Sequence, residues 1–148
     1  MAKIIPFKGF LPPKSLAKIV SSPPYDVLSS DEARNIVKKN DKSFLRVIKP
    51  EVDFSKTEKS SNDFLHDHAS NNLKNYISRG TLLQDNNDSL YVYQISMGSH
   101  TQTGIVSAVS IKQYNDGLIK KHELTRPDKE DDRTMHMEKT KANTGPVF

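Results

Sequence analysis

The longest run of helical periodicity in the chain is Lys59-Ser-Ser-Asn-Asp-Phe-Leu-His-Asp-His-Ala-Ser-Asn-Asn-Leu-Lys-Asn-Tyr-Ile-Ser-Arg79. Most of its apolar residues recur at intervals of three or four positions, a spacing that places them on one face of a helix. Gly80 follows where a glycine commonly ends a helix. We therefore predict a helix over about 59–79 that covers one side of a sheet and is solvated on its other faces. The apolar stripe comprises Leu65, Ala69, Leu73, Tyr76 and Ile77.

Two stretches beyond this helix have the composition and alternation of β-strands, Leu90–Met97 and Thr103–Ile111. Gly98-Ser99-His100 separates them, which predicts a β-hairpin. The segment Phe44–Ile48, apolar except for Arg46, is the best candidate for a buried strand in the first half of the chain. Together these elements predict an α+β fold, in which a mixed sheet carries the long helix on one face and the polar segment 120–136 at its edge.

The N-terminal third predicts one short strand and two helices. Ile4-Ile5 precedes Pro6, which favours an edge strand. A short helix is expected over Lys14–Val20, after two prolines. A second helix is expected over Asp31–Lys39, because Ser29 and Glu32 have the spacing of a capping box.

Composition restricts the class of protein. At 148 residues the chain is the size of one domain, and only 34% of its residues are hydrophobic. Its net charge is +4, but 22 basic and 18 acidic residues are interleaved, which supports polyanion binding only weakly and makes nucleic acid the less favoured partner. No apolar run approaches the length of about 20 residues that a membrane span requires. We expect a soluble, cytoplasmic protein.

Metal and disulfide chemistry find little support in the sequence. Cysteine is absent, which excludes disulfides, thiol catalysis and cysteine-ligated metals. His66 and His68 form the only close histidine pair, but they would lie on opposite sides of a helix. We therefore expect no metal site made by the protein alone. The chain turns apolar at Val147-Phe148, which we interpret as the start of a further strand in a longer protein.

The stretch Gly117–His136 is the part of the sequence with most potential for chemistry. Thr125 and Asp128 have the spacing of a capping box, and Pro127 is typical of a first helical turn. At helical spacing Arg126 and Arg133 share a face, with His136 beside them. Because a helix N-terminus favours anions, this arrangement predicts a phosphate or nucleotide site.

The same residues have a simpler interpretation. Acidic residues near the start of a helix and basic residues near its end complement the helix dipole, and no function is required for that. Asp128–Asp132 and Lys139–Lys141 follow this pattern. Asp26 likewise has two interpretations, since the rigid Pro23-Pro24 could present it to a site or it could cap its own turn.

Several longer segments together resemble one family. They are Ser22–Val27, Ser43–Pro50, Leu90–Tyr93 with Thr103–Ile105, and above all Ile119–Arg133. They are similar to the bacterial and archaeal family of proteins of unknown function called DUF1015, whose members are several hundred residues long. The resemblance implies that this chain is an N-terminal fragment. Through the ParB label that such proteins often carry, it also implies a ParB/sulfiredoxin-like nucleotide-binding core linked to phosphoryl transfer. The His-Glu-x-Thr-Arg sequence at 122–126 departs from the ParB phosphate motif.

Two functional hypotheses follow. In the first, a nucleotide (with Mg²⁺) or a phosphorylated small molecule binds between Arg126 and Arg133, with Lys120 adding charge. The candidate hydrogen-bond donors are His122 and His136, and the candidate bases or metal ligands are Glu123 and Asp26. In the second, the protein is a ParB-like module that binds DNA or another protein without catalysis, although no basic recognition helix is evident. A third possibility is a truncated domain without activity of its own.

Overall fold

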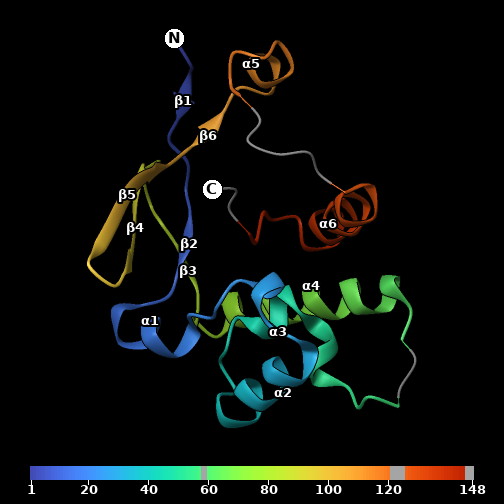
Figure 1. Cartoon of the computed structure of the whole chain (residues 1–148). Coiled ribbons are helices and arrows are strands. Elements are labelled where there is room, and N and C mark those ends of the chain that lie inside the picture. The colour runs from blue at the N-terminus through green and yellow to red at the C-terminus, as the bar shows by residue number, and fades with distance from the viewer. Residues whose placement is uncertain (58–59, 121–125, 146–148) are drawn as a thin grey trace. The chain divides into compact units, whose positions relative to one another are not determined.

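The computed structural model describes residues 1–57, 60–120 and 126–145 (Figure 1). Helices and small sheets together confirm the α+β class. Contacts divide the chain into two compact units. The strand unit contains residues 1–10 and 84–120 of the described chain, and the helical unit contains 11–57, 60–83 and 126–145. The predictions of a single domain and of a fragment stay predictions.

The helical unit consists of five α-helices and two short 3₁₀ helices within the described residues. Their bounds are α1 (Lys14–Val20), η1 (Tyr25–Val27), α2 (Ser30–Lys39), α3 (Leu45–Ile48), η2 (Pro50–Asp53), α4 (Asn62–Ser78) and α6 (Pro127–Thr140). The predicted helix at 14–20 is confirmed. The predicted capping box of α2 is also present, because Glu32 N donates to Ser29 Oγ and Ser29 N donates to the Glu32 carboxylate.

The long helix α4 is confirmed, with slightly tighter limits than we predicted. Ser61 caps its N-terminus and accepts a hydrogen bond from Phe64 N. Gly80 follows its C-terminus with a φ of +68°, the left-handed conformation in which glycine avoids the strain of a side chain. Ala69, Leu73 and Tyr76 of the predicted stripe are buried. Within the helical unit α4 packs against α3, η2 and α6, whereas we predicted that it covers a sheet.

The prediction of a strand over Phe44–Ile48 is wrong, because Leu45–Ile48 form the helix α3. A short apolar run does not distinguish a buried strand from a buried helix. Here α3 lies between two hydrophobic clusters: Val47 belongs to one cluster, and Leu45 and Ile48 belong to the other. The 3₁₀ helix η2 follows α3 directly, beginning at Pro50.

Each hydrophobic cluster links several helices. The first joins α1, α3 and α4 through Val20, Val47, Leu73, Tyr76 and Leu82. The second joins α2, α3 and η2 through Ala33, Val37, Leu45, Ile48 and Val52. Burial of such side chains supplies the main stabilisation of the unit. Because Val52 of η2 belongs to the second cluster, this packing fixes the position of η2 relative to α2 and α3.

The strand unit contains the predicted hairpin. Strands β4 (Tyr91–Met97) and β5 (His100–Val106) are antiparallel, with Tyr91 opposite Val106 and Met97 opposite His100. Gly98 at the turn has a φ of +60°. The second predicted strand is interrupted after Val106 and continues as β6 (Ala108–Val109), and Ile111 already begins α5 (Ile111–Asn115).

The remaining strands are short. Strand β1 (Ile4–Ile5), which we predicted, pairs antiparallel with β6, and β2 (Phe10–Leu11) pairs with β3 (Leu83–Gln84). The strands that the structure describes thus pair two by two, and the larger mixed sheet that we predicted is not among them. Phe44–Ile48, which we predicted as a strand, and α4, which we predicted to cover the sheet, both belong to the helical unit.

Candidate functional site

The helical unit contains a cavity of about 240 Å³. Three of its lining residues come from α6 and three from the start of α4: Lys129, Asp132 and Arg133, and Asn62, Leu65 and His66. The others come from η1 and from the α3–η2 region: Tyr25, Ile48, Lys49, Pro50 and Glu51. Segments more than 100 positions apart in the sequence thus meet at one concave surface, the arrangement expected of a ligand site.

The α6 side of the cavity presents two cations and one carboxylate. Asp132 and Arg133 lie three and four positions after Lys129, so both share a face of the helix with it. The guanidinium of Arg133 lies over the ring of Tyr25, with its central carbon 4.3 Å from the ring centroid. Its Nη2 also donates to Asp132 Oδ2 over 2.9 Å. The aromatic ring and the carboxylate together fix the position of Arg133 at the cavity.

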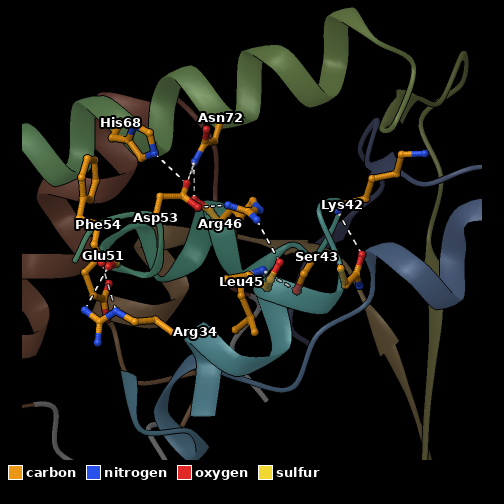
Figure 2. A network of polar contacts seen from close by, with 12 residues as sticks. Arg34, Lys42, Ser43, Leu45, Arg46, Glu51, Asp53, Phe54, His68 and Asn72 are labelled. Atoms are coloured by element: carbon orange, nitrogen blue, oxygen red, sulfur yellow. Dashed lines mark hydrogen bonds and ion pairs between the residues drawn. The ribbon is translucent and has the colours of Figure 1, made fainter. Parts of the chain in front are cut away.

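The η2 side contributes Lys49 and Glu51, whose side chains form an ion pair of 3.1 Å. Ser30 Oγ donates to the same carboxylate oxygen of Glu51 over 3.1 Å. Arg34 holds the backbone here, because its Nη2 donates to Glu51 O and its Nε to Phe54 O (Figure 2). The two side chains are therefore presented by a backbone that is tied to α2.

A network around Asp53 fixes the end of η2 against α3 and α4 (Figure 2). The Asp53 carboxylate pairs with Arg46, lies 2.8 Å from His68 Nε2 and accepts from Asn72 Nδ2 over 3.0 Å. Asn72 Nδ2 also donates to Arg46 O over 2.8 Å. Because the side chain of Asp53 is only 12% exposed, these contacts act in a partly desolvated environment. We infer that this network positions η2, and with it the cavity-lining residues Pro50 and Glu51.

Two histidines lie at the α4–α6 contact beside the cavity. His66 lines the cavity and is 4% exposed, and His136 is 1% exposed. Their rings meet edge to face with centroids 5.6 Å apart. Burial is the main cause that lowers the pKa of His136 to about 4; the nearby Arg133 and His66 contribute to this lowering, and Asp132 opposes it. His136 is therefore a neutral imidazole at pH 7, with its Nε2 3.0 Å from Thr144 Oγ1.

The structure brings together only some of the residues that the sequence singled out. Arg133 lines the cavity, and His136 lies one turn further along α6, buried behind it. Asp26 is exposed and is not among the lining residues, although its neighbour Tyr25 is. Lys120 is exposed and belongs to the strand unit. His122 and Glu123 lie outside the described residues.

The N-terminus of α6 differs from the anion site that we expected there. Arg126 is the N-cap residue and makes no side-chain cap, while Thr125 lies outside the described residues. Arg126 Nη2 instead pairs with Asp128 over 2.8 Å, and this hydrogen bond lowers the pKa of the Asp128 carboxyl. Asp128 and Glu130 already place negative charge at this helix end. The cavity lies further along α6, at Lys129–Arg133, and Arg126 does not line it.

Sequence reasoning missed most of the cavity. Tyr25, Lys49, Glu51 and His66 are separated along the chain and have no shared motif. Lys49 follows the segment Phe44–Ile48, which we wrongly predicted as a strand, and the sequence pattern raised His66 only as a metal ligand. One signal was available in the sequence: Lys129 precedes Arg133 by four positions, or about one helical turn, which places both cations on one face of α6.

A family model supports the relationship that the segment patterns suggested. The model described as "Protein of unknown function (DUF1015)" matches residues 4–148, and the chain therefore belongs to this family. Searches of curated proteins and of solved structures returned no match. The ParB-like core stays a prediction.

Within residues 1–57, 60–120 and 126–145, no helix is long and apolar enough to cross a membrane. Over the same residues, no group of three or more histidines and carboxylates is placed to hold a metal ion.

Proposed function

We propose that the helical unit binds a phosphorylated small molecule through its phosphoryl group, in the cavity between α6, α4 and η2. The observation that carries this proposal is that Arg133 and Lys129 of α6 line the same cavity as Lys49, which lies at the α3–η2 junction. Cations gathered in this way favour a dianionic group more strongly than a single surface lysine does.

The pairing of these cations leaves capacity for a ligand. Asp132 receives two donors of Arg133, from Nε and Nη2, and a guanidinium has five in all. The cavity also contains only two carboxylates, Asp132 and Glu51, beside the three cations. A phosphoryl group would therefore add hydrogen bonds to Arg133 and would balance the remaining positive charge.

The size of the cavity favours a small ligand. Pockets for drug-sized molecules enclose about 300–1,000 Å³, whereas this cavity measures about 240 Å³. The guanidinium of Arg133 covers one face of the Tyr25 ring, where a nucleotide base would otherwise stack. We therefore favour a compact phosphorylated molecule, or the phosphate end of a nucleotide, as the ligand. Phosphoryl transfer would use Asp132 or Glu51 as the base or as the ligand of Mg²⁺.

A thermal-shift panel tests the proposal: inorganic phosphate, phosphoserine, ADP, ATP and CTP, each with and without Mg²⁺. A ligand at a hundred times its dissociation constant stabilises the folded protein by about 2.7 kcal/mol. We expect at least one phosphorylated compound to raise the melting temperature of the wild type, and Arg133→Gln to abolish this rise.

Two further arginine variants locate the site. Arg126→Gln removes a charge from the same helix outside the cavity, and Arg79→Gln removes an exposed charge at the end of α4. Loss of the ligand-induced shift in Arg126→Gln but not in Arg133→Gln would place the site at the helix N-terminus and contradict the cavity. The absence of any shift in a wild type that melts cooperatively would reject phosphate binding and favour an interaction module.

A further inference from the structure

His66 is the most deeply buried polar side chain that lines the cavity. It lies in the second turn of α4, and this part of α4 contacts α6 through three polar interactions. Lys139 Nζ pairs with Asp63 over 2.7 Å and with Asp67 over 3.0 Å, and Ser70 Oγ donates to Lys139 O over 2.8 Å. These contacts hold the part of α4 that contains His66 against α6.

Neither ring nitrogen of His66 has a hydrogen-bond partner among the described residues. Its Nε2 lies 3.3 Å from Asp132 Oδ1, close enough for a charge contact but without hydrogen-bond geometry. Two other histidines of the helical unit each have a contact, since His68 Nε2 lies 2.8 Å from Asp53 and His136 Nε2 lies 3.0 Å from Thr144, although His136 Nδ1 has no partner among the described residues. Buried polar groups in folded proteins nearly always have partners, because an unpaired one destabilises the fold.

We propose that His66 donates a hydrogen bond to the phosphoryl oxygen of the bound ligand and so determines which anions the cavity accepts. This inference rests on the proposed function. Arg133, Lys129 and His66 line one cavity, so a tetrahedral oxyanion in it has acceptors for all three. A ligand without an acceptor at the depth of His66 leaves the imidazole unpaired and binds more weakly.

A purely structural role for His66 makes the opposite predictions. The edge-to-face contact with His136 would then be its contribution, and its replacement would lower the stability of the fold without changing ligand affinity. If instead His66 serves the ligand, its unpaired nitrogens destabilise the free protein. In that case His66→Leu, which fills a similar volume without polar atoms, melts at the wild-type temperature or above it.

Calorimetric titration of the full chain with inorganic phosphate tests the inference, using the wild type, His66→Leu, His66→Asn and Arg133→Gln. We expect His66→Leu to weaken binding about tenfold or more, with no loss of melting temperature. His66→Asn, which keeps an N–H donor, is expected to recover part of the affinity. Unchanged affinity in His66→Leu, together with loss in Arg133→Gln, would overturn this inference and leave the proposed function intact.

Imidazole resonances in the wild type provide a second readout that does not depend on any variant folding. During titration with phosphate we expect the ¹⁵N signals of His66 to move, and those of His68, which is paired with Asp53, to remain in place. If phosphate binds and the His66 signals do not move, the inference is wrong. If the wild type binds no phosphate or phosphorylated compound at all, the proposed function fails and this inference fails with it.

Discussion

Lowering the pH should destabilise the helical unit through His136. This imidazole has a folded-state pKa of about 4 against an ordinary value of 6.5, mainly because it is buried. Between pH 6.5 and pH 4, His136 is therefore protonated in the unfolded chain but remains neutral in the folded protein. The stability from the neutral imidazole is complete above pH 6.5 and decreases as the pH falls.

The size of this effect follows from the shift in pKa. From the two pKa values, the linkage relation gives a loss of about 2 kcal/mol at pH 5. Below the folded-state pKa the loss approaches about 3 kcal/mol. Losses of this size are a large fraction of the total stability of a small domain. The opposing contribution of Asp132 is the smallest of those that act on His136.

The assay is urea denaturation at half-unit steps between pH 8 and pH 4.5, for the wild type and for His136→Gln. The variant keeps a hydrogen-bonding side chain at Thr144 but does not titrate. Since the other ionisable groups are common to both proteins, the difference between the two stability curves isolates His136. We expect the wild type to lose about 2 kcal/mol more than the variant between pH 7.5 and pH 5. Parallel curves, or an NMR titration in which His136 protonates near pH 6.5, would refute the reasoning.

Two other predictions concern the scaffold around the cavity. Asp53→Asn should destabilise the protein by about 3 kcal/mol in chemical denaturation, because it leaves Arg46 and His68 without their partly buried charged partner. As a control, Asp67→Asn alters an exposed ion pair with Lys139 and should destabilise the protein by less than about 1 kcal/mol. Equal effects of the two substitutions would show that the Asp53 network does not stabilise the fold. Gly80→Ala should cost about 1 kcal/mol through its positive φ alone, since the nearest atom to an added methyl group is Leu83 Cδ2 at 3.9 Å. Gly145→Ala, at a position with open space and no such φ, is the control, and a Gly80 variant as stable as that control would contradict the predicted helix end.

Local signals in the sequence predicted most of the helices and the hairpin. The capping box at Ser29 and Glu32, the glycine after Arg79 and the short Gly98-Ser99 turn each act within a few residues, so the sequence pattern contains them completely. The error at Phe44–Ile48 has a tertiary cause. Leu45, Val47 and Ile48 are apolar because α3 lies between two hydrophobic clusters, and that position is determined by helices far away in the sequence.

The candidate site was predictable only in part, for the same reason. Arg133 and His136 lie on one helix, and helical spacing was sufficient to associate them. Spacing does not reveal that Lys49 and His66 line the same cavity as Arg133, because those contacts depend on how α3, α4 and α6 pack. The charge pattern also drew attention to Arg126, where the structure shows an exposed pair with Asp128.

The most direct test of the central claim is calorimetric titration at 0.15 M salt, with the phosphorylated compound that gives the largest thermal shift. We predict that Arg133→Gln weakens binding about 10- to 100-fold, the loss expected when a charged hydrogen bond to an anion is removed. Arg126→Gln and Arg79→Gln, which remove the same charge outside the cavity, should change affinity by less than about threefold. Equal losses in all three variants would indicate binding to diffuse positive charge, and no loss in Arg133→Gln would contradict a phosphate site in this cavity.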